Sequence, residues 1–139
     1  MFDLTPLTVL MRWLHLASAA ILVGGMVFAR LAMTRSLGSL SPETRDEVAG
    51  RAAVAYRPLA IAAVICLVLS GTYQFYSSSG HSLRHNILFG LKMALVLHVF
   101  SAAILIVQPR NPRRVGMMTG VAVSGTLIIL ISALLRQFY

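Results

Sequence analysis

The sequence predicts an all-α integral membrane protein, a four-helix bundle whose helices cross the bilayer up-down-up-down. Three observations predict this class. The 139 residues are 58% hydrophobic and 12% charged, with a mean hydropathy of +0.80, whereas soluble domains contain about 25% charged residues. Four apolar runs reach the ~20 residues that a transmembrane helix requires. Little sequence remains outside these runs, so residues 1–139 are interpreted as a single transmembrane domain.

The expected helices span about residues 7–30, 58–76, 87–107 and 116–136. The first apolar run is too long for a cleavable signal peptide and lacks a small-residue cleavage site. Residues 34–57 are expected to form a loop that contains a short helix. Ser41-Pro42-Glu43 predicts the start of that helix, because serine is a good N-cap and proline suits the first helical position. The helix then either stops before Pro58 or runs on into the second span.

The basic residues predict the orientation of the chain in the membrane. The net charge is +8, from eleven arginines and one lysine. Eight arginines lie in or beside the first and third loops, namely Arg30, Arg35, Arg45, Arg51, Arg57, Arg110, Arg113 and Arg114. The positive-inside rule places these loops in the cytoplasm and both termini outside, in a bacterial-type inner membrane. This distribution accounts for the charge without nucleic acid, and no aromatic residues interleave with the arginines as a nucleic-acid site would require.

A short phrase occurs twice in the chain. Leu14–Val23 and Leu97–Ile106 share Leu-His, Ser-Ala and Ala-Ile-Leu in register. The ends of the second and fourth helices also match weakly, as Gln74-Phe75-Tyr76 and Gln137-Phe138-Tyr139. These matches indicate a tandem two-helix repeat about an axis along the membrane normal. The alternative is a chance match, because membrane helices draw on few residue types.

The repeated phrase places one histidine on the first helix and one on the third. Ionisable groups inside a bilayer are costly and are candidates for function. The first and third helices are diagonal in an up-down-up-down bundle, so His15 and His98 are predicted to face each other as axial ligands of a b-type haem in the outer half. Lys92 is the alternative second ligand and would have to be neutral. The side chains expected to line the haem are Met11, Ser18 and Ser101.

Each histidine taken alone also fits a purely structural role, hydrogen-bonded to a carbonyl or a serine. A second ligand set competes with the haem. His15, His81 and His85, with Met11, would bind copper or zinc at the outer mouth, because imidazole and thioether suit copper. The histidines considered as metal ligands are therefore His15, His81, His85 and His98. If Lys92 is not a ligand, its side chain is expected to extend toward the lipid headgroups on the outer side.

Two motifs of the first helix carry a family resemblance. Arg12-Trp13-Leu14-His15 followed by Val23-Gly24-Gly25-Met26-Val27-Phe28 resembles the first helix of the copper-resistance D (CopD) family. Val68-Leu69-Ser70-Gly71 and Leu91-Lys92-Met93-Ala94-Leu95-Val96-Leu97 resemble its later helices. The four-helix HemJ-type protoporphyrinogen oxidases share the histidine of the first helix and the Leu-Lys of the third. The resemblance covers the first three helices, about two-thirds of the chain.

The resemblance implies either copper handling across the inner membrane or a haem b protein that oxidises a porphyrinogen, with His15 and Lys92 as its important residues. Three features depart from the pattern. Leu22 replaces the tryptophan common before the Gly-Gly pair, and the chain is far shorter than full CopD proteins. His98 is not a residue associated with either the CopD family or the HemJ-type oxidases.

The leading hypothesis is a small membrane haem b protein that transfers electrons or performs redox chemistry, with HemJ-like oxidase activity left open. The alternatives are copper binding or transport across the membrane, and a structural subunit of a larger complex. The expected surroundings are the lipid bilayer and either a membrane-protein partner or a second copy of the chain.

Overall fold

The computed structural model describes residues 5–77 and 82–135, and four helices in this part of the chain are long and apolar enough to cross a membrane. The first, Pro6–Ser39, is one long helix that is divided by two π-helical turns and ends in a 3-10 turn. Its segments are α1 (Pro6–Ala19), the π-turn η1 (Ala20–Gly24), α2 (Gly25–Phe28), the π-turn η2 (Ala29–Met33), α3 (Thr34–Ser36) and the 3-10 turn η3 (Leu37–Ser39). The other three are α4 (Pro42–Tyr76), α5 (Leu83–Ile106) and α6 (Arg114–Leu135). The predicted all-α membrane architecture is confirmed.

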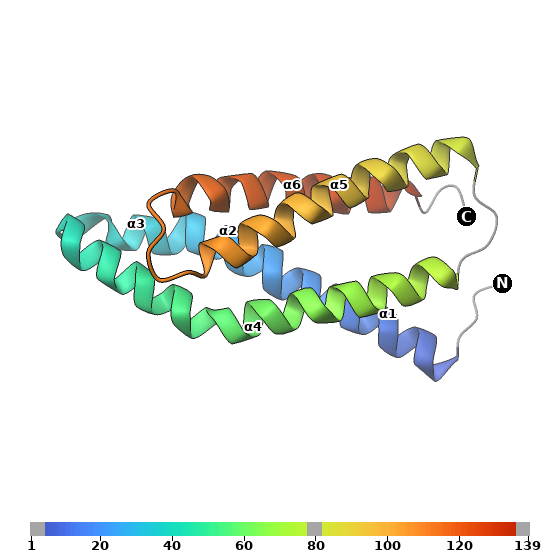
Figure 1. The fold of residues 1–139 in the computed structure, drawn as a ribbon, viewed down its shortest axis with the longest axis horizontal. Coiled ribbons are helices and arrows are strands. Elements are labelled where there is room, and N and C mark those ends of the chain that lie inside the picture. Colours follow the sequence, from blue (N-terminus) through green and yellow to red (C-terminus); the bar gives the residue numbers. More distant parts are fainter. Residues whose placement is uncertain (1–4, 78–81, 136–139) are drawn as a thin grey trace.

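The helices pack in a ring. α1 packs against α4, α4 against α5, and α5 against α6, while α6 returns to the first helix at η1, α2 and η2. The first and third transmembrane helices are therefore diagonal. α1 begins and α6 ends at the same end of the bundle (Figure 1). We call this the terminal end and the opposite end, which holds the turn at 107–113, the loop end.

The first two long helices extend further than the sequence predicts. The expected loop at 34–57 is reduced to Leu40 and Ser41, because the first helix continues to Ser39 and α4 begins at Pro42. Ser41 caps α4 as expected, since its hydroxyl accepts a hydrogen bond from the Thr44 N–H. α4 then continues through Pro58 without interruption.

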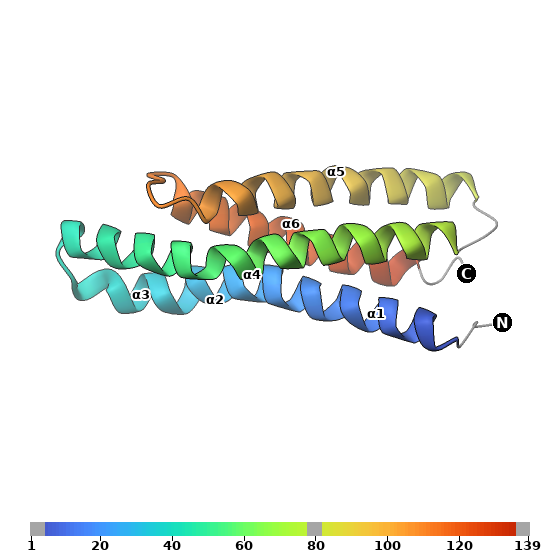
Figure 2. The same ribbon diagram turned by 60° about the horizontal axis from the view of Figure 1, so that its bottom comes forward.

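The hairpin between the first helix and α4 projects past the turn at 107–113 (Figure 2). Gly50 marks the crossing point, where an added Cβ would lie 2.9 Å from the Pro109 carbonyl oxygen. α4 has 35 residues, which corresponds to ~52 Å at 1.5 Å per residue and exceeds the ~30 Å of a bilayer core. The polar start of α4 therefore lies outside the hydrocarbon region.

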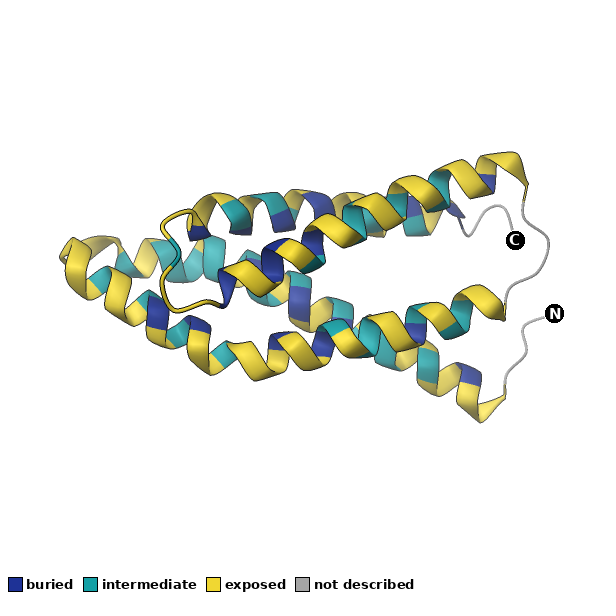
Figure 3. Cartoon of the chain, in the orientation of Figure 1, coloured by how far each residue is buried: buried dark blue, intermediate teal, exposed yellow. Residues whose placement is uncertain are grey.

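Exposed residues cover the outer faces of the helices (Figure 3), and many of them are large and apolar. Trp13, Leu16, Phe28 and Ile129 are each at least 60% exposed. Exposure of such a surface to water would be unfavourable, whereas in a bilayer it contacts apolar lipid chains. The core is small and consists mainly of Leu22, Met26, Ala103, Ile106 and Val121. This surface supports a multi-pass membrane protein.

Arg114 stabilises the loop end. The residue is only 8% exposed, and its guanidinium donates to the carbonyl oxygens of Ile106 at 3.1 Å, Gln108 at 2.6 Å and Pro109 at 3.2 Å. The last carbonyls of a helix have no partner within the helix and carry partial negative charge. One arginine therefore caps α5 and fixes the turn that leads into α6.

Candidate functional site

His15 is held against α4 by a hydrogen-bond relay. Its Nδ1 lies 2.9 Å from the Ser70 hydroxyl oxygen, and that hydroxyl donates its single proton to the Cys66 carbonyl at 2.6 Å. Ser70 can therefore only accept from the histidine, which assigns the proton of the neutral imidazole to Nδ1. Nε2 then carries a free lone pair on the opposite edge of the ring from Ser70.

Small and polar residues of α4 fix the position of this imidazole. A Cβ added at Gly71 would lie 3.5 Å from His15 Cε1, so glycine lets the ring lie close to the α4 backbone. Nearer the terminal end, the Thr8 and Tyr73 hydroxyls lie 3.0 Å apart and link α1 to α4 a second time. Ser70 is fully buried. These contacts restrict the ring to one orientation.

Lys92 enters the bundle from α5. It shares the inward face of that helix with His85 and Val99, which lie seven residues before and after it and are both buried. Lys92 is half-buried, and its positive charge acts on His15. The two residues are thus coupled electrostatically, although they lie on diagonal helices.

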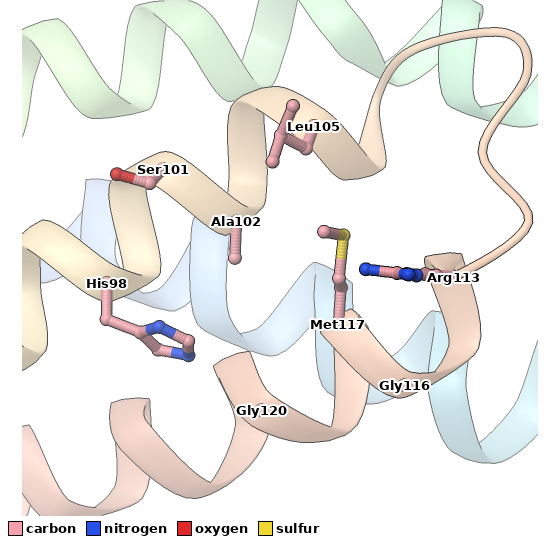
Figure 4. Close-up of a pocket in the computed structure, with 8 residues that line it drawn as sticks. All are labelled: His98, Ser101, Ala102, Leu105, Arg113, Gly116, Met117 and Gly120. Atoms are coloured by element: carbon pink, nitrogen blue, oxygen red, sulfur yellow. The ribbon is translucent and has the colours of Figure 1, made fainter.

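His98 lies elsewhere, in contrast to the prediction that it faces His15. It is exposed, in a groove of about 550 Å³ between residues 98–105 of α5 and residues 113–120, at and just before the start of α6 (Figure 4). α5 turns Val99, Ala103 and Ile106 inward, which rotates residue 98 to the outer flank by about 100°. His98 also lies past the middle of α5 (Leu83–Ile106), in the half nearer the loop end.

The remaining predicted haem residues divide between these two places. Met11 is half-buried one turn before His15, and Ser18 is buried one turn after it on the same side of the first helix. Ser101 instead lines the groove with His98. The structure therefore groups Met11, His15 and Ser18 along one side of the first helix, with Lys92 in range of His15, and separates His98 and Ser101 from them.

The outer histidines predicted as copper ligands are described only in part. His81 lies outside the described residues. His85 is 3% exposed, and its ring stacks nearly parallel on Phe89 with centroids 6.2 Å apart. Within residues 5–77 and 82–135, no three His, Cys, Asp or Glu side chains are grouped closely enough to hold one metal ion.

The sequence did not identify the partner of His15. Ser70 lies 55 positions away on another helix, and the only local signal is a serine and a glycine together inside an otherwise apolar span. Comparison of the chain with protein-family models, curated proteins and solved structures gave no match. The site is therefore interpreted from its own geometry.

Proposed function

We propose that this chain is a small membrane haem b protein in which His15 would ligate the haem iron. The observation that carries the proposal is the relay from His15 through Ser70 to the Cys66 carbonyl. Metal-ligating histidines almost always donate their other ring N–H to an oxygen, which fixes the tautomer and the ring orientation. His15 is arranged in this way, with Nε2 as the available ligand atom.

Lys92 replaces His98 as the preferred second ligand in this proposal. Lys92 lies on the inward face of α5 and in electrostatic range of His15, whereas His98 faces the groove beside α6. In its neutral form the Lys92 amine has a lone pair that would be able to bind the haem iron. Bound haem supplies one-electron redox chemistry, and this supports a role in electron transfer.

The chain contributes orientation and electronic tuning. The Nδ1–H···Oγ bond to Ser70 would raise the basicity of the imidazole as a ligand, an effect by which proteins adjust a bound metal. Gly71 sets how closely the ring lies against α4.

Three single variants test the ligand assignment, expressed with ample haem supply and purified in detergent. We expect His15→Ala to lose haem, and Lys92→Met to keep it with a change from a six-coordinate low-spin to a high-spin spectrum. His98→Ala should match the wild type in haem-to-protein ratio and spectrum. Circular dichroism checks that each variant is folded. Retention of haem by a folded His15→Ala variant, or its loss in His98→Ala, would contradict the proposal.

A further inference from the structure

The groove that contains His98, which we call the α5–α6 groove, is a second candidate site. It lies on the outer side of the α5–α6 pair, and its walls are mainly apolar or small, with Ala102 and Leu105 on α5 and Gly116, Met117 and Gly120 on α6. A Cβ added at Gly116 would have no neighbour within 4 Å. The groove is thus open toward the surrounding lipid and has room for a chain-like ligand.

A cationic side chain stands at one end of the groove. Arg113 immediately precedes α6, and its guanidinium points into the groove beside Met117 (Figure 4). Within residues 5–77 and 82–135 this guanidinium has no hydrogen bond or ion pair, in contrast to its neighbour Arg114, which donates to three carbonyls. The position at the start of a transmembrane helix places this charge at headgroup depth.

A polar ring stands further along the same groove. The His98 imidazole is exposed, and its Nε2 would be 3.3 Å from a Cβ added at Gly120. The structure gives it no hydrogen-bond partner in the described part of the chain. Gly120 follows Arg113 by seven residues, or ~10 Å along α6. A polar ring left unpaired at hydrocarbon depth is costly, so the ligand must supply a polar group here as well.

We propose that the α5–α6 groove binds an anionic phospholipid from the leaflet at the loop end. Its phosphate pairs with Arg113, its ester carbonyl accepts a hydrogen bond from His98, and one acyl chain lies over Met117, Gly116 and Gly120. A lipid has this order of groups, with the anion at the interface, the esters below it and the hydrocarbon deepest. Basic pockets between transmembrane helices bind anionic headgroups in this way.

Two pairs of substitutions test the site. Gly116→Leu fills the groove, and Gly90→Leu is its control, because Gly90 also has open space around an added Cβ but lies outside the groove. Arg113→Gln removes the charge inside the groove, and Arg110→Gln removes a charge from the same turn outside it. Native mass spectrometry then measures the binding of phosphatidylglycerol and of phosphatidylcholine to each purified protein.

We expect the wild type to bind phosphatidylglycerol more tightly than phosphatidylcholine. Arg113→Gln should weaken phosphatidylglycerol binding about tenfold, the scale of one lost charge-assisted hydrogen bond. Gly116→Leu should weaken it at least as much, because the leucine side chain occupies the space of the acyl chain, and the two controls should stay within about twofold of the wild type. Equal binding of the two lipids, or unchanged binding in Gly116→Leu, would overturn the proposal. So would a loss of self-association in Gly116→Leu without loss of lipid, because a second helix would then occupy the groove.

Discussion

Ser70→Ala is the most informative single substitution for the candidate site. Ser70 is fully buried, its hydroxyl accepts a hydrogen bond from His15 Nδ1–H at 2.9 Å, and it donates one to the Cys66 carbonyl at 2.6 Å. Alanine removes the hydroxyl with little change in volume, so helix packing is preserved. The imidazole then loses the acceptor that fixes its tautomer and its rotation.

Two magnitudes follow from this loss. A buried donor left without a partner costs about 1–3 kcal/mol of stability. Loss of the outer-shell partner of a ligating histidine weakens metal binding about 10–100-fold. We therefore expect the affinity of the apoprotein for haem, measured by titration of the Soret absorbance, to fall by one to two orders of magnitude in Ser70→Ala.

Thr72→Ala is the matched control. Thr72 lies on the same helix and donates its hydroxyl to the Val68 carbonyl at 2.7 Å, but it is exposed and does not contact His15. This variant should bind haem as the wild type does. Equal haem affinity in Ser70→Ala and Thr72→Ala would refute the relay as the feature that prepares His15 for ligation.

Two further predictions concern stability. Arg114→Met leaves the carbonyls of Ile106, Gln108 and Pro109 without their charged donor. The free energy of unfolding, measured in mixed micelles, should therefore fall by about 2–3 kcal/mol. A stability equal to that of Arg110→Met would argue against the cap. Gly125→Ala would place a Cβ 2.6 Å from Val23 Cγ1, whereas Gly24→Ala meets nothing within 4 Å. Gly125→Ala should therefore lower the free energy of unfolding by about 1–3 kcal/mol through overpacking, and Gly24→Ala should leave it unchanged. Equal thermal midpoints of the two variants would contradict this packing.

Hydropathy predicted the four spans well but not the ends of the first two helices. The expected loop at 34–57 has few apolar residues, and a polar segment outside the bilayer gives no hydropathy signal for a helix. Its sequence from Glu43 to Ala55 nevertheless contains many good helix formers. α4 therefore continues from the membrane into the polar hairpin, and local propensity, rather than hydropathy, determines its length.

The two histidines show what the pattern of a membrane helix leaves undetermined. α5 is apolar on nearly all sides, so no periodicity distinguishes the face that meets the core from the face that meets lipid. Side-chain size and packing decide the rotation, and they turn Val99 inward and His98 outward. His15 was placed correctly on the first helix, but its partner Ser70 depends on the long-range register between α1 and α4, which one sequence does not reveal.

The proposed ligation of a haem b by His15 is tested by a reduced-minus-oxidised visible spectrum of the purified protein. A pyridine haemochrome assay on the same sample gives the haem-to-chain ratio. We expect sharp α and Soret bands with about one haem b per chain. A colourless protein, obtained from cells with ample haem supply, would contradict it and leave His15 as a structural histidine that packs α1 against α4.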